Sequence, residues 1–180
     1  MFELSEPIET LRRLINETGM KKSILKWSIR ALVGLAVLVQ FVRPARTNPP
    51  IDEKLTIQKN SHMSTEASDI LLRSCYDCHS SATVWPWYSN IAPVSWYLVR
   101  HVNAGRKELS FSDWGSYTAK RRARKLKEIC EQLEKNEMPL STYLPLHPDA
   151  GLSDADKALL YQWAREERAQ IEMTAADTLH

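Results

Sequence analysis

The residues best suited to chemistry lie in one short run, Cys75-Tyr76-Asp77-Cys78-His79. The C-x-x-C-H spacing is typical of covalent haem attachment, because two thiols three residues apart can reach the two vinyl groups on one edge of a porphyrin. The His that follows then lies beneath the iron as a proximal ligand. A structural zinc site would need two further ligands at matching spacing, and a thioredoxin-like redox pair would need a βαβ context; the sequence offers neither. The run predicts one haem c, attached through Cys75 and Cys78, with its iron bound by His79.

The sixth ligand of the iron has three candidates. Met138 stands at an expected helix-to-loop junction, directly before Pro139, where the chain can fold over the far face of the haem and present a thioether. His101 is the alternative, since a haem with two His ligands is chemically sound, and His147 comes third. Filled axial positions predict an electron carrier and no enzyme. An open or displaceable sixth site would instead predict a haem-based gas or redox sensor, or a peroxidase-like protein.

Aromatic and basic residues near the run have two interpretations each. Trp85 and Trp87 can wall a haem or donate hydrogen bonds to its propionates, although large aromatic side chains in a small domain are more often core. We predict that both contact the cofactor. The basic run over 120–127 is more typical of a solvated helix face than of a docking patch for an acidic redox protein. A redox partner is expected but not identified, and a formal charge of +2 with a pI near 8.4 argues against nucleic acid.

An apolar stretch over 24–42 follows a basic lead of Lys21, Lys22, Lys26 and Arg30. Such a stretch is typical of a secretory signal or a signal anchor. Arg43 stands where a cleavage site wants a small residue, which favours retention as a single-pass anchor. The positive-inside rule then predicts a cytoplasmic segment over 1–23 and a periplasmic domain at the inner membrane. Met20 is an alternative start, and residues 1–19 would then lie upstream of it.

The rest of the chain predicts a tether and one all-α domain. Residues 43–63 are rich in Pro, Asn, Lys and Thr and lack periodic hydrophobicity, as a tether does. Five glycines in all, with long runs of Leu, Ala, Lys and Glu, favour helices over 64–172, followed by a tail over 173–180. The expected helices begin near Ser64, Pro93, Thr118 and Ser153, and Trp96 and Leu159 are among the side chains expected to face the core.

Several segments beyond the C-x-x-C-H run also match a known family. They are Trp85-Pro86-Trp87-Tyr88, Pro93 with Trp96, His101-Val102 with Gly105, Leu109-Ser110-Phe111-Ser112, Met138-Pro139-Leu140, and His147 with Asp149-Ala150. With these segments the chain resembles the bacterial haem-binding-domain family of monohaem cytochrome-c-like proteins. The resemblance implies a cytochrome-c-like helical domain around one covalent haem, held at the outer face of the inner membrane behind an N-terminal transmembrane signal anchor.

Overall fold

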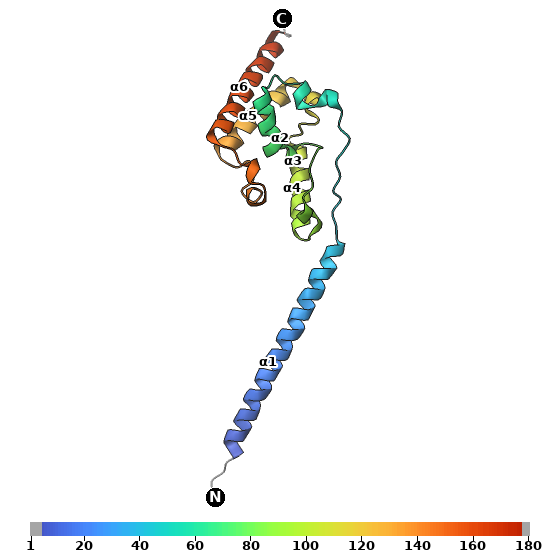
Figure 1. Ribbon diagram of the computed structural model, residues 1–180, viewed down its shortest axis with the longest axis vertical. Helices are drawn as coiled ribbons and strands as arrows, with labels where there is room; N and C mark the ends of the chain where they lie inside the picture. Colours follow the sequence, from blue (N-terminus) through green and yellow to red (C-terminus); the bar gives the residue numbers. More distant parts are fainter. Residues whose placement is uncertain (1–4, 178–180) are drawn as a thin grey trace.

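The computed structural model describes the backbone of residues 5–177 and the side chains of residues 20–177. Within this part of the chain the structure is helical and has no β-strand, as the sequence predicts. The α-helices are α1 (Ser5–Leu38), α2 (Thr65–Ser74), α3 (Tyr76–His79), α4 (Val94–Glu108), α5 (Ala119–Glu134) and α6 (Asp154–Asp177). Figure 1 shows α1 as a single rod that projects from a domain built of the other helices. The ends of the expected cytoplasmic segment 1–23 and of the expected tail 173–180 lie outside the described residues.

The rod contains the predicted apolar segment but begins well before it. Its helix starts at Ser5, and a span over Met20–Phe41 is long and apolar enough to cross a membrane. None of the apolar window in this span is buried against the rest of the protein. By length and composition the span can be a membrane anchor, and a signal sequence has the same properties.

The run from Cys75 to His79, which we call the attachment run after its predicted role, lies where α2 passes into α3. Ser64 caps α2 as predicted, because its hydroxyl accepts a hydrogen bond from the Ala67 N–H at 3.2 Å. After α2 ends at Ser74, the carbonyl of Cys75 accepts hydrogen bonds from the Cys78 N–H at 3.2 Å and the His79 N–H at 3.0 Å. This tight turn brings the two thiols and the imidazole to one end of α2.

The helices α5 and α6 pack side by side, and α6 also packs against α2, so that these helices form the core of the domain (Figure 1). Thr118 caps α5 through a hydrogen bond from the Arg121 N–H, and Ser153 accepts one from the Asp156 N–H at the start of α6. The fully buried side chains of the core include Ile57, Leu71, Phe111, Trp114, Leu126 and Leu160. The predicted helix starts at Ser64, Thr118 and Ser153 are thus confirmed.

The segment 43–63 differs from the free tether that its composition predicts. Ile57 is fully buried, and its N–H donates to the Phe111 carbonyl at 2.8 Å. Closer to the rod, the guanidinium of Arg106 on α4 donates to the Thr47 carbonyl and to Asn48 Oδ1, both at 2.7 Å. The few apolar residues of the segment, among them Leu55 and Ile57, form no helical or strand period, so composition alone does not reveal that the segment packs on the domain.

Three side chains also differ from their predicted surroundings. Trp96 is 37% exposed and Leu159 is 39% exposed, although both were expected to face the core. Lys125, in the basic run expected to be solvated, is buried, and its ammonium lies 2.5 Å from Glu128 and 3.7 Å from Glu108. Ion pairing satisfies the buried charge.

Candidate functional site

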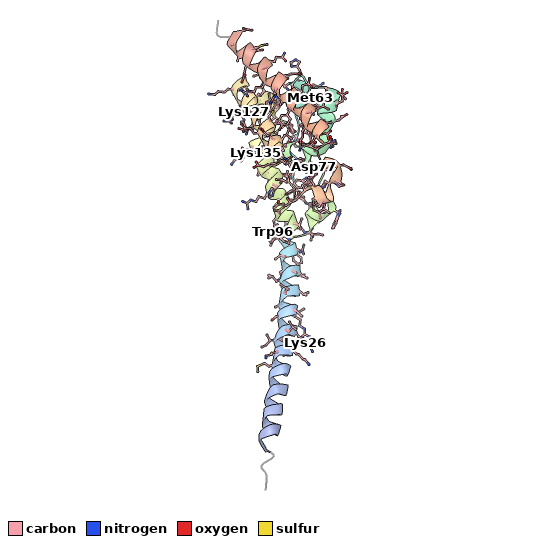
Figure 2. The ribbon with its side chains drawn as sticks, turned by 90° about the vertical axis from the view of Figure 1, so that its left-hand side faces the viewer. Lys26, Met63, Asp77, Trp96, Lys127 and Lys135 are labelled. Atoms are coloured by element: carbon pink, nitrogen blue, oxygen red, sulfur yellow. The ribbon has the colours of Figure 1, made fainter. Side chains whose placement is uncertain are left out.

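A cavity of about 490 Å³ lies beside the attachment run. Its size falls in the range of roughly 300–1,000 Å³ that is usual for small-molecule and cofactor sites. Cys75, Cys78 and His79 line it, together with Met138 and His101. The structure therefore brings the predicted attachment residues and both leading candidates for the sixth ligand to one cavity. Figure 2 shows Asp77, at the centre of the run, within the domain and well away from the rod.

The imidazole of His79 is held in one orientation by two backbone carbonyls. Its Nδ1 lies 3.1 Å from the Gly105 carbonyl and 3.1 Å from the Leu109 carbonyl. Since carbonyls only accept, Nδ1 carries the proton and Nε2 keeps its lone pair. Burial also lowers the pKa of His79, which favours the neutral ring. A neutral imidazole with a free Nε2 is the form that binds iron.

The two thiols are protonated at neutral pH before any bond is formed to them. Burial raises the pKa of Cys75 to about 12, with a further contribution from the charge of Cys78. Burial also raises the pKa of Cys78 to about 11, and the nearby Asp77 carboxylate adds to this shift. Both cysteines, like Cys130, are free thiols, and a protonated thiol is a poor metal ligand. No group of three or more His, Cys, Asp or Glu side chains in the described residues is placed to hold a bare metal ion.

A glycine allows α4 to approach the attachment turn. A Cβ built on Gly105 would stand 2.6 Å from the Cys78 carbonyl oxygen and 3.2 Å from the carbonyl carbon. These distances are shorter than van der Waals contact, so only glycine fits without a shift. The same residue supplies one of the two carbonyls that orient His79. Close packing of α4 on α3 and the orientation of the imidazole therefore depend on one position.

The loop after α5 is tied to the attachment run through an acid. The Tyr143 hydroxyl donates to Asp77 Oδ2 at 2.7 Å, and the other carboxylate oxygen of Asp77 accepts from the Val84 N–H at 2.9 Å. Burial and the bond to Asp77 raise the pKa of Tyr143. The loop that carries Met138 is thus fastened next to Cys78.

The histidine candidates occupy different places. His101 lines the cavity, and its Nδ1 lies 2.8 Å from the Tyr97 carbonyl. His147 does not line the cavity; its ring stacks on Tyr143 with the ring centres 3.8 Å apart, and it lies 3.3 Å from the Tyr88 hydroxyl. The described contacts of His147 are thus with Tyr143 and Tyr88, and its binding to the iron stays a prediction.

The aromatic pair predicted to contact the cofactor is not part of the cavity wall. Neither Trp85 nor Trp87 lines the cavity, whereas the neighbouring Tyr88 does. Trp87 is 73% exposed. Trp85 is partly buried, and its indole N–H has no hydrogen-bond partner. Contact of either residue with a haem stays a prediction.

Sequence analysis missed the residues that position His79. The carbonyls of Gly105 and Leu109 are backbone atoms, and no side chain type marks them. The one available signal is Gly105 itself, because a glycine inside a helix is unfavourable unless close packing requires it. The Tyr143–Asp77 bond joins residues far apart in the chain, and no local pattern predicts it.

Comparison with known proteins agrees with this geometry. The model of the haem-binding domain family matches residues 34–166. No curated protein and no solved structure matches the chain. The matched range begins in the last turns of α1, ends within α6, and includes every residue brought together at the cavity. The chain belongs to the haem-binding domain family.

Proposed function

We propose that the protein is a membrane-anchored monohaem c-type cytochrome that carries single electrons at the outer face of the inner membrane. One haem would be attached through Cys75 and Cys78 and bound at its iron by His79. The family match supports haem binding. The observation that carries the c-type assignment is the His79 ring, whose Nδ1 is engaged by two carbonyls beside two thiols at one cavity. When bound, the haem supplies a one-electron redox couple.

The chain's own residues bind the group, orient it and exclude water. The Gly105 and Leu109 carbonyls fix the His79 tautomer and make the lone pair of Nε2 a stronger electron-pair donor toward iron. Apolar side chains from α2, α4 and the loop after α4 line the cavity, among them Leu71, Leu98 and Phe111. An apolar wall suits the flat porphyrin and keeps solvent from the iron, which tunes the reduction potential.

Met138 is our proposed sixth ligand, with His101 as the alternative. Both line the cavity. A thioether ligand raises the reduction potential, and two filled axial positions leave no place for a substrate. We therefore propose an electron carrier and no enzymatic reaction. The Tyr143–Asp77 bond supports Met138, because it fastens the Met138 loop beside the attachment turn.

The proposed anchor is the Met20–Phe41 span. Lys21, Lys22, Lys26 and Arg30 lie in its first half. Under the positive-inside rule this bias supports a cytoplasmic start and a domain on the periplasmic side. Lys26 and Arg30 can extend their charged ends toward the inner face, which leaves an apolar length close to the ~30 Å of a bilayer core.

A second candidate function is a haem-based sensor or peroxidase-like protein with a displaceable sixth ligand. Met138 is only half-buried and lies in a loop, outside any helix. A ligand on such a loop can leave the iron more readily than one on a packed helix. His101, on α4 at the same cavity, could then replace it.

Visible spectra of the haem-matured full-length protein, in ferric and ferrous forms and with carbon monoxide, test these proposals. We expect a six-coordinate low-spin haem that ignores carbon monoxide. Met138→Ala should open the iron to carbon monoxide, while His101→Ala, the matched variant at the same cavity, should leave the spectrum unchanged. A low-spin spectrum retained in Met138→Ala and lost in His101→Ala would assign the ligand to His101. Ready carbon monoxide binding by the unmodified protein would favour the sensor, and the absence of haem would overturn both proposals.

A further inference from the structure

The short turn Val39–Phe41, which directly follows α1, is hydrogen-bonded to the domain together with Val42. The Gln40 side chain donates from Nε2 to the Ala92 carbonyl at 3.1 Å and accepts from the Ala92 N–H at 2.9 Å. The Trp96 indole N–H donates to the Val42 carbonyl at 2.6 Å. We call these bonds the Gln40 clasp. Because Gln40 lies within the last turn of the Met20–Phe41 span, the clasp fixes the start of α4 beside the end of that span.

Exposed apolar side chains flank Ala92 of the clasp in sequence. Trp87 is 73% exposed, Ile91 is 43% exposed and Trp96 is 37% exposed. They lie on the short turn Trp87–Asn90, on the residue that follows it, and in the first turn of α4. We call these three residues the junction patch. Figure 2 shows Trp96 at the lower edge of the domain, directly against the upper end of α1.

The junction patch lies outside the cavity wall and outside the buried core. Two tryptophans and an isoleucine exposed together are unusual on a soluble surface and mark an interaction site. The position of the junction patch indicates what covers it. A residue beside the end of a membrane-spanning helix lies at the level of the lipid headgroups, where Trp is enriched because its ring is apolar and its N–H is polar.

We propose that the haem domain lies directly on the lipid bilayer, with the junction patch inserted into the headgroup region of the outer leaflet. The proposal rests on the proposed membrane anchor. Arg43 and Arg46 strengthen it, since they follow the span immediately and supply positive charge at the depth of lipid phosphates. The Gln40 clasp pairs both backbone polar groups of Ala92 and so holds this segment next to the end of the span.

Photolabelling of the holoprotein in lipid nanodiscs tests the proposal. The nanodiscs contain phosphatidylethanolamine and phosphatidylglycerol, with a fraction of lipid carrying a diazirine near the carbonyl end of one acyl chain. After irradiation, mass spectrometry locates the lipid adducts along the chain. We expect adducts on residues 31–42 of the anchor and on residues 87–96. We expect none around Met173, which is 64% exposed but lies near the far end of α6, remote from α1 (Figure 1).

Variants separate the patch from the anchor. Trp87→Ser combined with Ile91→Ser should abolish adducts on 87–96 and keep those on 31–42, while Met173→Ser, an equally exposed apolar side chain elsewhere, should change neither. Adducts on the anchor without adducts on 87–96 refute the docking and leave the anchor intact. Loss of adducts on both segments refutes the anchor itself. Crosslinks from 87–96 to another copy of the chain, in place of lipid adducts, would show that a protein covers the patch and overturn the proposal.

Discussion

Replacing Gly105 by alanine tests the link between helix packing and the orientation of His79. The new Cβ would stand 2.6 Å from the Cys78 carbonyl oxygen, so α4 and the attachment turn must separate by about 0.8 Å to restore ordinary contact. The hydrogen bond between His79 Nδ1 and the Gly105 carbonyl, now 3.1 Å, would lengthen beyond the ~3.5 Å at which such a bond is lost. The substitution therefore acts on His79, the proposed iron ligand, without changing its side chain.

The expected change in stability follows from three contributions. Overpacking costs about 1–3 kcal/mol, and the weakened hydrogen bond costs about 1 kcal/mol. Alanine gains about 1 kcal/mol over glycine in a helix. The free energy of unfolding should therefore fall by about 1–3 kcal/mol, which lowers the melting temperature by roughly 4–12 °C for a domain of this size.

Circular dichroism melting of the holoprotein measures this change, and haem absorbance per chain reports attachment. Gly34→Ala is the matched control, because a Cβ on Gly34, in the helix α1, meets no atom within 4 Å. We expect Gly34→Ala to leave domain melting and haem content unchanged. A Gly105→Ala protein as stable as the parent, with full haem content, would show that the close approach of α4 does not hold His79 in place.

Two further predictions concern single side-chain contacts, one at the cavity and one at the start of α6. Tyr143→Phe removes the hydrogen bond that fastens the Met138 loop to Asp77. Because such a bond contributes about 1 kcal/mol, imidazole added to the holoprotein should displace the sixth ligand at a roughly fivefold lower concentration. The control Tyr161→Phe on α6 should not change this imidazole titration. Asp156 has its pKa held at about 2, below its ordinary value of 3.8, chiefly by a hydrogen bond from Arg73. The pair of Arg73 and Asp156 should therefore stabilise the fold above about pH 4 and lose this effect as the pH falls toward 2. Asp156→Asn should lower the free energy of unfolding at neutral pH by about 1 kcal/mol, and the free energy of unfolding of this variant should fall less steeply between about pH 4 and pH 2.

Local signals in the sequence predicted the helices well. Ser64, Thr118 and Ser153 each stand before an apolar pattern of helical period, and each accepts the capping bond that this position favours. Signals of this kind are local, so they can be interpreted without knowledge of the tertiary fold. The fate of Trp96 was not predictable in the same way. Its spacing on α4 suits a buried face, but Trp96 lies at the edge of the domain, beside the end of the Met20–Phe41 span.

The candidate site was predictable in its chemistry and only partly in its geometry. Spacing alone singled out Cys75, Cys78 and His79, and the structure brings these three residues to one cavity. The positioning of His79 by carbonyls depends on how α4 packs, and packing has no sequence motif. Ile57 shows the same limit, because its burial depends on contacts with Phe111, far along the chain.

The packing of segment 43–63 on the domain affects how the protein would encounter a redox partner. A free tether over 43–63 would let the domain travel up to about 70 Å from the bilayer. The bonds from Arg106 to Thr47 and Asn48, and those at Gln40, remove that reach. Under the proposed anchoring, a domain held in this way would stay at one height above the bilayer. Its encounters with a membrane-bound partner would then become a two-dimensional search across the membrane plane, and their rate would depend on the lateral density of that partner.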